Sequence, residues 1–137
     1  MTRTSQRLAA WGEDQAASFM QEKGYRVVAR NVRTPYGEID LVAQLDFADE
    51  IARCDHLSST SLTVFVEVKT RRASGFGYPE MSVTAKKRAH LLDAAQAYLQ
   101  LHPELAGDWR IDVIAIQLKG PEDSPEILHF ENAFTSA

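Results

Sequence analysis

The sequence predicts an α/β fold in which a mixed β-sheet is flanked by helices, within a single domain covering 1–137. Three observations predict it. Two stretches place apolar residues at helical spacing, and four stretches rich in β-branched residues alternate apolar and polar positions. A helix-length segment separates the third strand from the fourth, which suits a parallel crossover, whereas the first three strands can form an antiparallel meander. A chain of 137 residues can bury such a core without disulfides.

The expected elements follow the order helix, three strands, helix, strand. The first helix is expected from Ser5 to Lys23, because Gly24 stands where a left-handed residue commonly ends a helix. Pro35 and Gly37 supply the backbone angles of a turn between the first two strands. Strands are expected at 25–31, 38–44, 62–70 and 109–119, with a short edge strand at 126–131. The second helix is expected at 84–100, and its apolar stripe is Leu91, Leu92, Ala95, Tyr98 and Leu99.

Charge is distributed unevenly along the chain, whose net charge is −4. A polar excursion at 46–61 carries −3 and the C-terminal tail at 120–137 carries −4, so the remainder is net +3. Because phosphate affinity depends on local potential, this distribution is compatible with a nucleic-acid partner and gives it weak support.

The cysteine content and the hydropathy of the chain indicate where in the cell the protein is expected. Cys54 is the single cysteine, which excludes an intrachain disulfide and a thiolate zinc site. The first ten residues contain no apolar signal-peptide core, and no stretch is long and apolar enough for a membrane span. We therefore expect a cytoplasmic protein without a membrane partner.

Two neighbouring strands carry the residues that indicate chemistry. Glu67 and Lys69 share one face of the third strand, and Asp40 shares a face of the second with Glu38 and Val42, opposite Ile39, Leu41 and Ala43. If the strands pair, Asp40 can lie beside Glu67, and two such carboxylates repel unless a proton or a cation lies between them. Oxygen ligands suit Mg²⁺ or Mn²⁺, and a neighbouring lysine can orient the attacking water. The alternative is an exposed Glu–Lys pair, which the position of Asp40 on a mostly apolar strand argues against.

Glu13 lies on the helical face that should pack on the sheet. On a helical wheel it falls among small or apolar residues, namely Ala9, Ala10, Ala16, Ala17 and Met20. A solvated glutamate is not expected on that face. Two interpretations stay open: a hydrogen-bonded structural glutamate, or a further acidic ligand of the same ion or a second one.

These residues form an ordered set of motifs that resembles the PD-(D/E)xK nuclease superfamily. The set is Gly12-Glu13, then Gly37-Glu38-Ile39-Asp40, then Phe65-Val66-Glu67-Val68-Lys69. More closely, the chain from about Trp11 to Ile116 resembles the bacterial YraN-like family, whose fold is Holliday-junction-resolvase-like. Supporting stretches are Gly24-Tyr25, Arg30-Asn31, Phe76-Gly77 and Arg110-Ile111-Asp112-Val113. The resemblance implies a restriction-endonuclease-like α-β-β-β-α-β core.

The resemblance also implies roles for individual residues. Asp40, Glu67 and the Val68 carbonyl would bind the ion, Lys69 would lie beside the attacking water, and Glu13 would assist as a further acid. Lys86 matches a position that contacts phosphate in many superfamily members, although a solvated helix residue is an equal alternative. Arg33, Arg71 and Arg72 are the further candidates for nucleic-acid contacts. Two departures are the absence of the motif proline, replaced by Ile39, and the length of the 46–61 excursion.

Weaker signals have structural interpretations. The acidic residues, Cys54 and His56 of the excursion could form a second metal site, but a solvated loop is favoured. Asp112 either lies near the acids or pairs with an arginine, and we favour a structural role. His90, His102 and His129 have no partners at metal-ligand or triad spacing.

Together these features predict an Mg²⁺- or Mn²⁺-dependent endonuclease acting on DNA, including branched or structured DNA. The alternative is a nucleic-acid-binding or scaffolding module that keeps the nuclease fold without turnover. By analogy with junction resolvases, in which two sites cut two strands, a homodimer is also an expectation.

Overall fold

The computed structural model describes residues 3–46, 61–72, 84–105, 107–118 and 124–133. Most of the excursion predicted at 46–61 and part of the acidic tail lie outside these residues. No helix in the described ranges is long and apolar enough to cross a membrane. The elements are α1 (Arg3–Glu22), β1 (Arg26–Thr34), β2 (Gly37–Asp46), β3 (Ser61–Arg72), α3 (Ala85–Leu101), the 3₁₀ turn η2 (Pro103–Leu105), β4 (Asp108–Leu118) and β5 (Glu126–Phe130).

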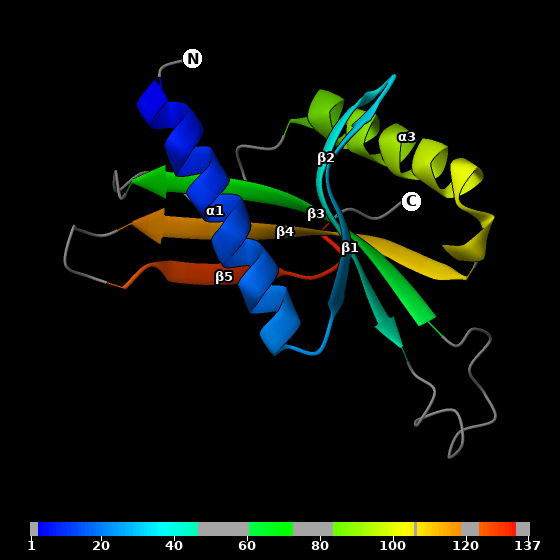
Figure 1. The fold of residues 1–137 in the computed structure, drawn as a ribbon. Coiled ribbons are helices and arrows are strands. Elements are labelled where there is room, and N and C mark those ends of the chain that lie inside the picture. Colours follow the sequence, from blue (N-terminus) through cyan, green and yellow to red (C-terminus); the bar gives the residue numbers. More distant parts are fainter. Residues whose placement is uncertain (1–2, 47–60, 73–83, 106, 119–123, 134–137) are drawn as a thin grey trace.

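The strands form one mixed sheet in the order β1-β2-β3-β4-β5. The first three strands pair antiparallel, β3 and β4 pair in parallel across α3, and β5 pairs antiparallel with β4 at the edge. The predicted meander, parallel pairing and edge strand are therefore confirmed. Figure 1 shows α1 running across one face of this sheet, with α3 lying by the β1–β2 hairpin. This is the predicted α/β fold.

Two apolar clusters fill the two faces of the sheet. Ala16, Ala17 and Met20 of α1 pack with valines, leucine and isoleucines of β2, β3 and β4. On the opposite face, α3 contributes Leu91, Ala94, Ala95 and Tyr98 to a cluster that includes Phe65 of β3. Burying these side chains on both faces is the main source of stability for such a layered fold.

The ends of the helices follow local rules. Gly24, with φ of 98°, ends α1 in the left-handed conformation that the sequence predicts. The side chain of Thr84 caps α3 by accepting a hydrogen bond from the Lys87 amide at 3.1 Å. Within α1, Gly12 packs so closely on β3 that an added Cβ would overlap the Thr70 side chain. The helix therefore lies directly against the strand just before Glu13.

The expected alternation along β2 is wrong at Asp40. Ile39 packs in the cluster beside α3, whereas Leu41 and Ala43 pack in the cluster beside α1. Strict alternation would put all three on one face. The pairing between β2 and β3 ends at Leu41 with Val66, so Asp40 lies just beyond the paired part of the strand. The irregularity therefore coincides with the point at which β2 leaves β3.

Candidate metal centre

The site forms where β2 parts from β3. Beyond Val66, β3 stays paired in parallel with β4 as far as Arg72. On its other side, the pairing with β2 that the structure describes ends at Val66. The Asp40 carboxylate occupies that position and accepts a hydrogen bond from the Val68 amide at 2.8 Å. A side chain thus replaces a ladder partner, because a buried backbone N–H requires an acceptor. Asp40 is fixed beside the strand that carries Glu67.

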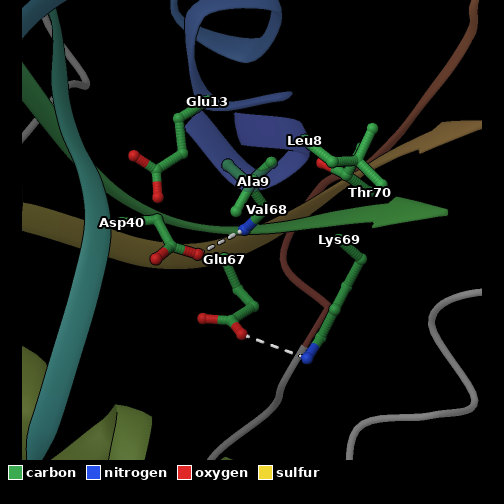
Figure 2. Close-up of a pocket in the computed structure, with 8 residues that line it drawn as sticks. All are labelled: Leu8, Ala9, Glu13, Asp40, Glu67, Val68, Lys69 and Thr70. Carbon is green, nitrogen blue, oxygen red and sulfur yellow. Dashed lines mark hydrogen bonds and ion pairs between the residues drawn. The ribbon is translucent and has the colours of Figure 1, made fainter. Parts of the chain in front are cut away.

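A pocket at this point collects the predicted acids. Glu13 reaches it from α1, Asp40 from β2 and Glu67 from β3, and Figure 2 shows the Glu13 carboxylate directed toward Asp40. Glu67 and Lys69 leave β3 on the same side, as their spacing predicts. The lining residues are Leu8, Ala9, Glu13, Asp40, Glu67, Val68, Lys69 and Thr70. All five residues that the resemblance implies for the metal centre therefore border one pocket.

Two lysines contact Glu67, whose side chain is only 5% exposed. The Lys69 ammonium lies 3.3 Å from Glu67 Oε1, and the Lys87 ammonium lies 3.5 Å from the same oxygen. Lys87 comes from the first turn of α3 and is exposed like its neighbour Lys86, but of these two only Lys87 contacts Glu67 in the described structure. The lysine that reaches the acids from this helix is therefore Lys87. Recognising Thr84 as the cap would have placed Lys87 in that turn but would not have shown which lysine faces the sheet.

The negative charge of the Asp40 carboxylate is not balanced by the groups around it. Burial is the largest effect and, together with the neighbouring Glu67, raises the pKa of Asp40 to about 7. Glu13 and Glu38 raise it further, while the hydrogen bond from Val68 opposes the change. The carboxylate is therefore poised to take up either a proton or a cation near neutral pH.

Glu38 joins the acidic group without having been assigned a role from the sequence. One carboxylate oxygen each of Glu13, Glu38 and Asp40 lies within 4.8 Å of the others. Burial raises the pKa of Glu13, and hydrogen bonding by Asn31 and the charge of Arg30 oppose that rise. The two-residue spacing from Asp40 already indicated a shared face for Glu38. These three carboxylates and Glu67 are the groups that could hold a divalent ion.

The predicted nucleic-acid contacts are more dispersed. Of the side chains that the structure describes, Arg33, Arg71 and Lys86 do not line the pocket. Arg33 and Lys86 are exposed, and Arg71 is half-buried two residues beyond Lys69 on β3. Arg72 ends the same strand, and its side chain lies outside the described residues. Their role in binding stays a prediction.

Asp112 belongs to a separate polar network. It is fully buried, and its carboxylate accepts hydrogen bonds from Arg110 Nε, Arg110 Nη2 and the Asn132 backbone amide at 2.8, 3.1 and 2.8 Å. His129 Nε2 lies 2.7 Å from the same carboxylate, and Lys23 Nζ lies 2.8 Å from His129 Nδ1. Because an ammonium can only donate, Nδ1 accepts and Nε2–H donates to Asp112. The predicted pairing of Asp112 with an arginine is confirmed.

Two of the histidines, which have no partners at metal-ligand or triad spacing in the sequence, contact acidic residues in the structure. His129 contacts Asp112 from the neighbouring strand β5, and His102 Nδ1 lies 2.9 Å from Glu104. The first contact joins residues far apart in sequence, so spacing along the chain could not predict it. Neither histidine lines the acidic pocket described above.

The α-β-β-β-α-β order, the mixed sheet and the helix on each face define a restriction-endonuclease-like core. The family model described as "Uncharacterised protein family UPF0102" matches residues 12–116. The chain therefore belongs to the UPF0102 family, which is the YraN-like family that its motifs indicate. The matched range contains Glu13, Asp40, Glu67 and Lys69.

Similar proteins occur in several bacteria. A UPF0102 protein of Syntrophotalea carbinolica is 39% identical over 133 residues, which cover 93% of this chain and 90% of the relative. A UPF0102 protein of Syntrophomonas wolfei is 40% identical over 127 residues, covering 93% and 96% respectively. A UPF0102 protein of Roseiflexus castenholzii is 38% identical over 138 residues, with both chains covered completely.

Proposed function

We propose that the protein is a divalent-metal-dependent endonuclease that hydrolyses phosphodiester bonds of DNA, with branched or otherwise structured DNA as the substrate class. The observation that carries this proposal is the convergence of Glu13, Asp40, Glu67 and Lys69 on one pocket where β2 leaves β3. The net charge of −4 is compatible with it, because binding depends on local rather than net charge. The proposal places the protein in the cytoplasm.

The donor set fits Mg²⁺ or Mn²⁺. Both ions prefer carboxylate and carbonyl oxygens, which Asp40, Glu67 and the Val68 backbone would supply. The raised pKa of Asp40 supports this assignment, since a cation would stabilise the ionised form that burial and Glu67 disfavour. A bound ion would polarise a phosphoryl oxygen and make water a stronger nucleophile at neutral pH.

The lysines would complete the reaction. Hydrolysis adds water across a P–O bond, so the attacking water loses a proton and the leaving sugar oxygen gains one. Lys69, held 3.3 Å from Glu67, can donate hydrogen bonds to the attacking water or to a phosphoryl oxygen. Lys87, whose side chain is 44% exposed, can turn toward a phosphate at the mouth of the pocket. Both would stabilise the negative charge that develops on phosphorus oxygens.

Cleavage assays with matched variants would test the proposal. Four-way junction, flap and linear duplex DNA are incubated with Mn²⁺ and the wild type, Asp40→Asn or Lys69→Ala. The expected result is cleavage by the wild type and a loss of roughly 100-fold or more in either variant. Equal cleavage by all three proteins would identify a contaminating nuclease and refute the assignment.

A second candidate function is a binding module without turnover. The observation that favours it is that one Glu67 oxygen already has two ammonium groups within 3.5 Å, so its charge is balanced without an ion. Calorimetric titration with Mn²⁺ separates the two functions. Absence of binding at millimolar Mn²⁺, together with junction binding that resists chelators, would favour the module over the enzyme.

A further inference from the structure

Asn31 has an unusual backbone conformation in the middle of β1. Its φ is 51°, in the left-handed region, and among the described residues only Asn132, with φ of 50°, is another non-glycine residue of this type. Side chains other than glycine enter this region at a conformational cost, which is smallest for asparagine and aspartate. Such outliers concentrate at functional sites, so the position of Asn31 needs a reason.

The pairing of β1 with β2 places Asn31 opposite Asp40. Arg30 pairs with Leu41 and Val32 pairs with Ile39, so the two intervening residues face each other without a pairing of their own. Asp40 is also where β2 stops pairing with β3. The left-handed residue in one strand therefore lies across from the irregularity that creates the pocket.

The same part of β1 holds α1 in place. Asp14 Oδ1 accepts a hydrogen bond from Arg30 Nη2 at 2.7 Å, and the next residue, Asn31, lies close enough to Glu13 for its side chain to oppose the rise in the pKa of that carboxylate. Gly12 packs directly on Thr70 of β3. Three consecutive helix residues thus each have a partner on the sheet, and the middle one is the acid that enters the pocket.

We propose that Asn31 is a positioning residue, whose left-handed backbone directs its amide to the Glu13 carboxylate and holds that carboxylate among Asp40 and Glu38. This inference rests on the proposed metal centre and adds the residue that sets the place of its helix-borne acid. Groups that orient metal ligands in this way typically affect metal affinity without contacting the ion.

Substitution by glycine separates the effect of the Asn31 side chain from the effect of its backbone conformation. Asn31→Gly keeps the left-handed conformation and removes the amide, and Asn132→Gly makes the same change away from the pocket. In calorimetric titrations with Mn²⁺ we expect roughly tenfold weaker binding for Asn31→Gly and less than a twofold change for Asn132→Gly. Wild-type affinity in Asn31→Gly, or an equal loss in both variants, would overturn the inference.

A metal-free measurement separates this inference from the proposed function. The urea midpoints of Asn31→Gly, Glu13→Ala and the double variant form a double-mutant cycle. If the midpoint shift of the double variant differs from the sum of the two single shifts, the contact between Asn31 and Glu13 is supported. Strictly additive shifts refute this contact, whatever the Mn²⁺ titrations show. If the wild type binds no Mn²⁺, the metal centre and the positioning role fail together, while a non-additive cycle would still identify the contact.

Discussion

Asp40 and Asp112 are aspartates on the two strands that flank β3, the first half-buried and the second fully buried, and their surroundings are opposite. The Asp112 carboxylate receives hydrogen bonds from Arg110, the Asn132 amide and His129. The Asp40 carboxylate receives one from a backbone amide, and its neighbours are three other carboxylates. Neighbouring donors outweigh burial and lower the pKa of Asp112, whereas burial and repulsion raise that of Asp40 to about 7.

The difference separates a structural aspartate from a candidate ligand. A buried carboxylate whose charge is fully compensated by protein groups has nothing left to bind. One that is surrounded by like charge costs free energy in the folded state unless a proton or cation joins it. Protein groups fully balance the negative charge of Asp112, but they do not balance that of Asp40. This contrast is the physical argument for a cation at the site between β2 and β3.

The largest expected effect is the loss of the Asp112 network. Asp112→Ala removes the carboxylate that the buried His129 contacts and leaves the half-buried Arg110 guanidinium with Tyr25 and the exposed Glu131 alone. We expect the free energy of unfolding to fall by about 3–5 kcal/mol, as is typical when one partner of a buried ion pair is removed. Urea denaturation measures it. A loss no larger than that of an exposed substitution would mean that the network contributes little stability.

Mn²⁺ binding should change stability in a pH-dependent way. Protons compete with the ion for Asp40, whose pKa is about 7, so stabilisation by Mn²⁺ should grow as the pH rises from 5 to 8. At a free concentration one hundred times the dissociation constant, binding adds about 2.7 kcal/mol. Thermal unfolding with and without Mn²⁺ tests this, and Asp40→Asn should not respond. Equal stabilisation at pH 5 and 8 would contradict the role of Asp40.

Asp40→Asn should stabilise the metal-free protein. The folded-state pKa of Asp40, about 7, exceeds its ordinary 3.8, so the folded protein binds the proton more tightly. The stability that this group contributes is complete below pH 4 and is lost as the pH rises through 7. The variant avoids that loss, so we expect a gain of about 1–2 kcal/mol at pH 8 and almost none at pH 4. A variant less stable than wild type at pH 8 would contradict this expectation.

The lysines beside Glu67 should affect DNA binding or cleavage more than they affect the stability of the fold. Arg110 is expected to do the opposite. We expect Lys87→Ala to weaken DNA binding or cleavage about tenfold, because a cation near phosphate is lost. Lys86→Ala tests the rival candidate for the phosphate contact, since it removes the same charge from the neighbouring residue. Both variants should unfold within about 0.5 kcal/mol of wild type. Equal effects of the two substitutions on DNA would remove Lys87 from the site.

Much of the fold was predictable because local patterns determine it. Gly24 marked the end of α1, alternation marked β3, and the helix between β3 and β4 indicated their parallel pairing. The convergence of Glu13, Asp40, Glu67 and Lys69 was also predicted, from the helical face of Glu13, the shared face of Glu67 and Lys69 and the assumed pairing of the two strands, although the alternation expected along β2 fails at Asp40.

What the sequence could not predict depends on contacts between distant segments. Ile39 breaks the alternation because β2 leaves β3 at that point, and no periodicity within β2 records where its partner ends. The choice of Lys87 over Lys86 depends on how α3 is rotated against the sheet. The contact of His129 with Asp112 requires the register of β5 on β4. Each of these is a property of packing rather than of local sequence.

Gly12 has a consequence for anyone who engineers this protein for stability. Glycine inside a helix is unfavourable by about 1 kcal/mol relative to alanine, so a thermostability campaign would select Gly12→Ala early. Here the added methyl group would meet Thr70 and push α1 away from β3. Glu13, the next residue, would move with the helix. A substitution chosen to improve the scaffold would then separate one acid from the others, so α1 should be excluded from such a library at this position.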